Sequence, residues 1–251
     1  PDFADVMGQS LARRAMVIAA AGGHNVLLIG APGTGKSMLA KRLPGILPPL
    51  TRDEAVETTK IYSIAGQLPQ GRGLISARPF RSPHHSASSA ALAGGGTLFR
   101  PGECSLANCG VLFLDELPEF SRESLEVLRQ PLEDGQITVS RAAGSATYPS
   151  RFQLVAAMNP CKCGYYGHPT RPWVSGPLLD RIDLCVEMDP IAFDELHASA
   201  PSESSAELRK QVLAARAVQA KRYAAPGFEG VHCNAQLTAG QVRRICRMTP
   251  A

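Results

Sequence analysis

The stretch that decides the fold runs from Gly30 to Ser37 and reads GAPGTGKS. It matches the pattern G-x-x-x-x-G-K-[ST] at every fixed position. The apolar run before it, residues 25–29, predicts a buried strand, and residues 37–43 predict a helix that Pro44 ends. A strand, a glycine-rich turn and a helix in this order predict a phosphate-binding loop, in which backbone N–H groups surround phosphate oxygens.

Two side chains of this loop have individual expected roles. We expect Lys36 to reach the β- and γ-phosphates of ATP and Ser37 to bind Mg²⁺. The alternative is a chance match in a glycine-rich turn, which the flanking strand and helix disfavour. The other loop residues expected to surround the nucleotide are Gly30, Pro32, Gly33, Thr34 and Gly35.

A second apolar run, residues 111–114, ends in Asp115 and Glu116. A buried strand that ends in two acids, downstream of a phosphate-binding loop, is typical of a Walker B motif. We expect Asp115 to hold the Mg²⁺ through water and Glu116 to orient and polarise the attacking water. The alternative is a solvated turn. Glu116 favours ATP hydrolysis over nucleotide binding alone.

Two further polar residues follow apolar segments. Asn159 ends a third predicted strand, residues 152–157, and is expected to contact the γ-phosphate or the water. The alternative is an ordinary turn before Pro160. Arg181 lies in the stretch GPLLDRID at residues 176–183 and is expected to reach a neighbouring subunit's nucleotide.

The remaining pattern predicts an α/β fold with a parallel sheet. We expect a core at residues 1–190 and a partial helical lid at residues 191–251, with helices at 8–21, 54–64, 122–132, 206–223 and 237–248. Another strand is expected at 184–187, and a hairpin with arms at 136–140 and 146–151. Residues 66–110 predict loops and short inserted hairpins.

Composition narrows the class of protein. The 251 residues are 44% hydrophobic and carry a net charge of +4, which permits an anionic partner without requiring one. The apolar stretches are too short for a membrane span, and no signal peptide is visible. Seven scattered cysteines favour reduced thiols in a cytoplasmic protein. The chain lacks an initiator Met, so we expect it to be a piece of a longer protein.

The order of these motifs resembles that of AAA+ ATPases and, more narrowly, of the magnesium-chelatase-like ComM/YifB family. The matching stretches are residues 5–9, 30–37, 79–85, 101–107, 110–120, 131–135, 147–163 and 175–183. The resemblance implies a ring-forming, hexameric ATP-driven motor that acts on DNA. In the ComM family that motor is a helicase that drives branch migration during natural transformation of bacteria.

The resemblance also implies roles for individual residues. Asn159 corresponds to the sensor-1 position and Arg181 to an arginine finger that acts in trans. Residues 6–9, including Val6 and Gly8, would line the adenine pocket. No sensor-2 residue can be matched in the C-terminal part, and we expect the domain that usually precedes the motor in the family to lie outside this piece of the protein.

Candidate DNA contacts follow from two insertions that the family places against a central pore. They fall at residues 78–100 and at the hairpin spanning residues 137–151. Arg141, and less favourably Arg151, could grip phosphates. His84 and His85 could contact DNA or a neighbouring subunit; a metal at this histidine pair is disfavoured. The alternative for the two arginines is that they are ordinary solvated charges.

A zinc site is a weaker hypothesis. Cys161 and Cys163, followed by His168, fall where the family carries a cysteine-rich segment, but its second cysteine pair is absent here. Three ligands are too few for a closed structural zinc site, so we favour free thiols in a loop.

Two other functions remain open from the sequence. The same motor motifs would serve the ATPase subunit of a magnesium-chelatase-type complex for metal insertion. A nucleotide-gated scaffold is the third possibility, and Glu116 and Arg181 argue against it because a scaffold needs no residue that orients water.

Overall fold

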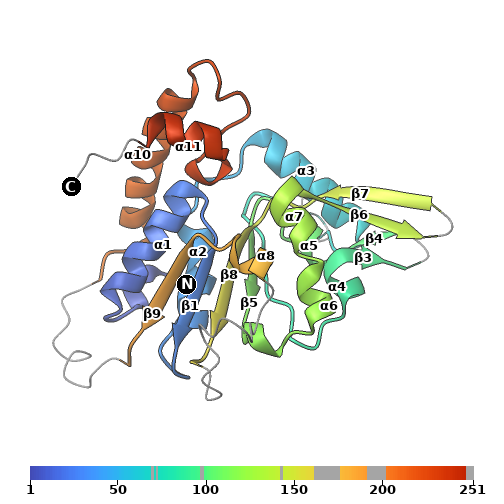
Figure 1. Ribbon diagram of the computed structural model, residues 1–251, viewed down its shortest axis with the longest axis horizontal. Coiled ribbons are helices and arrows are strands. Elements are labelled where there is room, and N and C mark those ends of the chain that lie inside the picture. Colours follow the sequence, from blue (N-terminus) through green and yellow to red (C-terminus); the bar gives the residue numbers. More distant parts are fainter. Residues whose placement is uncertain are drawn as a thin grey trace.

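The computed structural model describes residues 1–68, 71, 73–96, 99–141, 144–160, 176–190 and 202–246. Its centre is a five-stranded sheet in the order β2-β5-β8-β1-β9, in which every neighbouring pair is parallel (Figure 1). The strands are β1 (Val26–Gly30), β2 (Phe80–Arg81), β5 (Val111–Leu114), β8 (Gln153–Met158) and β9 (Leu184–Met188). The predicted α/β class with a parallel sheet and C-terminal helices is confirmed.

Helices cover both faces of the sheet because its central strands are apolar on both sides. In β1, Val26 and Leu28 pack against α1 (Ser10–Gly22) and α2 (Lys36–Ile46). Leu27 and Ile29 point to the other face. That face is covered by α4 (Ser89–Ala93), α5 (Glu103–Leu106), α6 (Arg122–Glu126) and α7 (Arg129–Asp134).

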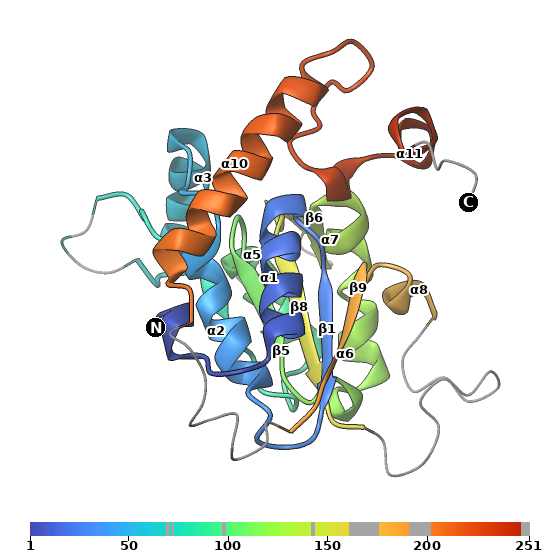
Figure 2. The ribbon, with the colours of Figure 1, turned by 90° about the vertical axis from the view of Figure 1, so that its left-hand side faces the viewer.

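The C-terminal helices join the first of these two cores. Helix α10 (Ser205–Tyr223) lies across α1 and α2 (Figure 2), and its Leu208 and Val212 are buried in the same apolar cluster. A short turn η3 (Asn234–Gln236) leads to α11 (Ala239–Ile245), which occupies the middle of the helix predicted at 237–248. The division of the chain at residue 190 stays a prediction.

Pro44 does not end α2, contrary to our expectation. The helix continues to Ile46 although Pro44 donates no hydrogen bond. It continues because Leu43 and Ile46 are fully buried and the Leu47 N–H bonds the Leu43 carbonyl at 3.3 Å. Packing of an apolar face therefore outweighs the local preference of one proline.

The single helix predicted at residues 122–132 is also wrong, because the chain breaks between α6 and α7. A tight turn, in which the Leu128 N–H bonds the Leu125 carbonyl at 3.1 Å, separates the two. Pro131 then lies in the first turn of α7, where its missing N–H costs nothing. Helix α7 then leads through Gly135 into β6.

Residues 66–110 contain more structure than the predicted loops and hairpins. Strand β2 joins the main sheet beside β5, although two residues are too few to produce a periodic signal. Strands β3 (Gly94–Gly95) and β4 (Arg100–Pro101) form a short hairpin. Helix α3 (Arg52–Ile64) precedes this region and begins at a capping box on Thr51.

The predicted second hairpin is confirmed. Strands β6 (Gln136–Arg141) and β7 (Gly144–Pro149) pair in antiparallel register and project from the body beside β3 and β4 (Figure 1). The Tyr148 hydroxyl donates a hydrogen bond to the Phe99 carbonyl and ties the two hairpins together. Arg151 lies beyond the hairpin, and its guanidinium pairs with Glu57 of α3.

The remaining elements are short: η1 (Phe3–Asp5), η2 (Leu117–Glu119) and α8 (Gly176–Leu179). In the part of the chain that the structure describes, none of the helices combines the length and hydropathy needed to cross a membrane.

We expect Gly110→Ala to lower the free energy of unfolding by about 1–3 kcal/mol, as overpacked sites do. A Cβ at Gly110 would lie 2.1 Å from the Pro79 carbonyl oxygen, so β2 would be pushed from β5. Urea denaturation measures the change. Gly73→Ala is the matched control, since a Cβ there meets no atom within 4 Å; equal stability of the two variants would contradict the prediction.

Candidate functional site

The loop after β1 is shaped by glycine. Gly33 and Gly35 adopt φ angles of 84° and 93°, in the left-handed region that favours this residue. A Cβ at Gly30 would lie 2.5 Å from the Met188 carbonyl oxygen of β9. The loop therefore leaves β1 tightly against its neighbouring strand and enters α2 at Lys36, with the helix N-terminus facing the space above the sheet.

Lys36 lies inside the loop with its side chain buried. Its ammonium donates hydrogen bonds to the carbonyls of Gly30 at 2.6 Å and Ala31 at 2.8 Å, and to Asn159 Oδ1 at 3.0 Å. Burial lowers the pKa of Lys36, and the nearby charge of Asp115 opposes that shift. The structure thus brings together the loop lysine and the asparagine that follows β8, two residues 123 positions apart.

Ser37 meets the acidic end of β5. Its hydroxyl donates a 2.6 Å hydrogen bond to Asp115 Oδ2, and Asp115 Oδ1 accepts the N–H of Glu116 at 3.0 Å. A hydroxyl and a carboxylate are the hard oxygen ligands that Mg²⁺ takes in nucleotide sites. The residues present therefore fit a magnesium ion between Ser37 and Asp115.

Glu116 follows in a left-handed backbone conformation, with φ at 53°. Its carboxylate lies 3.1 Å from His85 Nδ1, and the rings of His84 and His85 are 4.0 Å apart. His84 Nδ1 contacts the Ser86 hydroxyl at 2.8 Å. The structure therefore places His85 against Glu116, a contact that the sequence analysis missed because it did not recognise β2, the strand that precedes residues 84 and 85.

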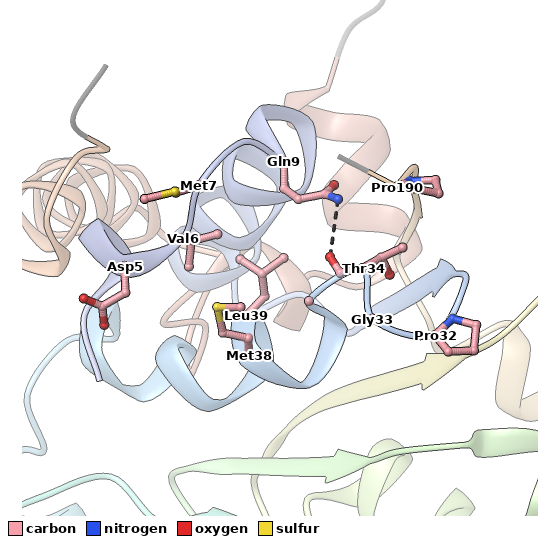
Figure 3. Close-up of a pocket in the computed structure, with 11 residues that line it drawn as sticks. Asp5, Val6, Met7, Gln9, Pro32, Gly33, Thr34, Met38, Leu39 and Pro190 are labelled. Carbon is pink, nitrogen blue, oxygen red and sulfur yellow. Dashed lines mark hydrogen bonds between the residues drawn. The ribbon is translucent and has the colours of Figure 1, made fainter. Parts of the chain in front are cut away.

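A cavity of about 390 Å³ lies beside the loop (Figure 3). One wall comes from the segment before α1 and the other from the loop and α2, and Gln9 spans them by donating to the carbonyls of Thr34 at 3.3 Å and Asp189 at 2.7 Å. The lining residues are Asp5, Val6, Met7, Gln9, Pro32, Gly33, Thr34, Gly35, Met38, Leu39 and Pro190. Gly8 lies in the same segment but does not line the cavity. An apolar cavity of this size suits a nucleobase; the adenine role of Val6 stays a prediction.

Arg181 lies at the opposite end of the strands from the loop. It comes three residues before β9, whose Leu184 pairs with Val26 at the start of β1, whereas the phosphate-binding loop follows the end of β1. A five-residue strand is about 15 Å long, so the backbone of Arg181 and the loop of its own chain lie at opposite ends of these strands. Its Nη2 is 3.0 Å from Glu133 Oε1 of α7. The role of Arg181 as an arginine finger stays a prediction.

The other candidates are left without a described contact to this site. Arg141 ends β6, but its side chain lies outside the described part of the structure. Cys161, Cys163 and His168 fall in residues 161–175, which are also outside it. Among the residues that are described, no three His, Cys, Asp or Glu side chains cluster as a metal site would require. The DNA and zinc roles stay predictions.

Comparisons with known proteins agree over nearly the whole chain. The family model for magnesium chelatase, subunit ChlI, matches residues 2–196, and the model for the ChlI C-terminal part matches residues 202–251. Competence protein ComM of Haemophilus influenzae is 47% identical over 98% of this chain and 49% of its own length. Protein YifB of Escherichia coli is 47% identical over 98% of this chain and 50% of its own length.

A more distant relative is the magnesium-chelatase 38 kDa subunit of Acidiphilium rubrum. It is 29% identical over 74% of this chain and 58% of its own length. The chain spans about half the length of the ComM and YifB proteins that it matches.

We expect Lys36→Ala to weaken the binding of Mg-ATP at least roughly tenfold, because it removes a charged hydrogen-bond donor from the loop. Titration calorimetry with Mg-ATP measures the dissociation constant. Lys41→Ala is the control, since this lysine is exposed on the same helix. Unchanged affinity in Lys36→Ala would mean that the loop does not bind phosphates.

Proposed function

Since the chain belongs to the magnesium-chelatase ChlI family of AAA+ proteins, we propose that it is the motor part of an ATP-hydrolysing ring that acts on DNA. The observation that carries the proposal is the meeting of three strand ends. Lys36 contacts Asn159, and Ser37 contacts Asp115, although these pairs come from distant parts of the chain.

In this proposal, each side chain at the strand ends has a separate task. The Lys36 ammonium leaves the carbonyls of Gly30 and Ala31 and meets the β- and γ-phosphates. Ser37 and Asp115 hold Mg²⁺, which supplies neutralisation of the charge that develops on the phosphates. Glu116 orients the attacking water, and Asn159 holds the γ-phosphate or that water.

The position of Arg181 supports the proposal of a ring. Its distance from the loop of its own chain leaves it free for the nucleotide of an adjacent subunit, where a guanidinium stabilises charge on the transferring phosphoryl group. We propose that Arg181 is this residue and that the ring is hexameric, as the family resemblance implies.

DNA as the partner is supported by the hairpins and by a relative's name. The hairpins β3–β4 and β6–β7 lie side by side and project from the core (Figure 1). The exposed polar side chains of Thr138 and Ser140 lie along β6, which ends at Arg141. The Haemophilus relative is called a competence protein. We therefore propose a helicase that promotes branch migration during natural transformation.

The deciding experiment is the rate of ATP hydrolysis with and without single-stranded and branched DNA over a salt series. We expect DNA to raise the rate and the stimulation to fall as salt rises, because phosphate contacts release counterions. Activity that ignores DNA and appears only with a chelatase partner would instead favour the metal-insertion function, which the Acidiphilium relative supports.

We expect Glu116→Gln to lower the turnover number at least about 100-fold while ATP still binds, because the amide cannot polarise water. Steady-state hydrolysis and ATP titration separate the two quantities. Glu119→Gln serves as the control, since this nearby carboxylate is exposed in η2. Normal turnover in Glu116→Gln would assign the water to another residue.

A further inference from the structure

Arg181 is held by a single carboxylate. Its Nη2 lies 3.0 Å from Glu133 Oε1, and among the described residues no other acidic side chain lies within ion-pair distance of it. The backbone of Arg181 is fixed independently, because its carbonyl accepts a 2.8 Å hydrogen bond from the Asn25 side chain at the start of β1. The contact with Asn25 at the sheet therefore positions the backbone of Arg181, and the ion pair with Glu133 orients its guanidinium.

Glu133 belongs to a row of alternating charges along α6 and α7. Arg129 lies 3.4 Å from both Glu126 and Glu133, and Glu133 also forms an ion pair with Arg181. Partial burial tends to raise the pKa of Glu133, but hydrogen bonds from Arg129 and Arg181 outweigh it and lower the pKa. Glu133 is thus kept as a carboxylate at neutral pH.

The same helix leads directly into the β6–β7 hairpin. Helix α7 ends at Gly135, whose φ of 67° turns the chain into β6. Gln130 Oε1 accepts the N–H of Thr138 at 3.2 Å, which fastens β6 to α7. The hairpin is therefore bonded directly to the helix that carries Glu133.

The apolar core underneath joins these parts to the segment around Arg181. Leu178 and Ile182, on either side of the arginine, lie in the same buried cluster as Leu128 before α7 and Ile137 in β6. Close-packed clusters transmit small displacements because they contain little free space.

We propose that Glu133 is a positioning residue for Arg181, through which the β6–β7 hairpin controls ATP hydrolysis at the neighbouring subunit. The proposal rests on the ring motor and the trans arginine proposed above. A guanidinium has five N–H donors, so the bond from Nη2 to Glu133 orients the group, while Nε and Nη1 have no partner among the described residues and can meet phosphate oxygens.

The first test compares Glu133→Gln with Glu126→Gln in the purified protein. We expect Glu133→Gln to lower kcat about tenfold, to change the KM for ATP less than twofold and to abolish stimulation by DNA. Glu126→Gln removes a carboxylate from the same row that does not reach Arg181, and we expect it to stay within twofold of the wild type. Wild-type behaviour of Glu133→Gln, or a rise in kcat, would overturn the proposal.

The second test asks whether Glu133→Gln acts on the ATP site of the neighbouring subunit. Rings mixed from Glu133→Gln and Lys36→Ala subunits contain sites that bind ATP and face an intact Arg181 from the partner. We expect such rings to regain activity per ATP-binding subunit, as rings mixed from Arg181→Ala and Lys36→Ala should. Recovery with Arg181→Ala but not with Glu133→Gln would mean that Glu133 acts within its own subunit.

A third comparison excludes a general loss of structure. The double variant Glu133→Gln with Arg181→Ala should be no slower than Arg181→Ala alone, because Glu133 acts only through that arginine. An additive loss would overturn the proposal. A wild-type protein without ATPase activity, or one that ignores DNA, would instead overturn the proposed function, so the two failures are distinguishable.

Discussion

The parallel pairing of β1 with β8 and β9 is the constraint on which the rest of the structure depends. Parallel strands end at the same edge of a sheet, so Gly30 at the end of β1, Asp115 after β5 and Asn159 after β8 must meet there. Strands β1, β5 and β8 are buried on both faces, so apolar packing holds them in place. Groups far apart in sequence are thereby held within hydrogen-bonding distance before any ligand binds.

The opposite edge of the sheet is ordered by polar side chains. Asn25 accepts the Leu154 N–H at 2.8 Å with its side-chain oxygen and donates to the Arg181 carbonyl with its nitrogen. Asp183 accepts the N–H of Asn25 at 2.8 Å. One asparagine thus links β1, β8 and the segment before β9, so the arginine and the phosphate-binding loop are fixed to opposite ends of the same strands.

The sequence was most informative where the deciding interactions are local. The loop at residues 30–37, the buried strands and the β6–β7 hairpin each follow from neighbouring residues and were predicted. The prediction that Pro44 ends the helix was wrong because tertiary packing extends α2 beyond this residue. The contacts of Glu116 with His85 and of Arg181 with Glu133 join residues that are 31 and 48 positions apart. No local sequence pattern predicts such contacts.

The segment before α1 has a consequence for the C-terminal helices. Val6 lines the cavity, and its carbonyl accepts a 2.7 Å hydrogen bond from the hydroxyl of Ser202, just ahead of α10. The Phe3 N–H donates to Ser205 Oγ at 2.8 Å, within the first turn of that helix. The segment that forms one wall of the cavity is therefore hydrogen-bonded to the start of α10. A ligand in the cavity would therefore contact the same segment that anchors the first turn of α10.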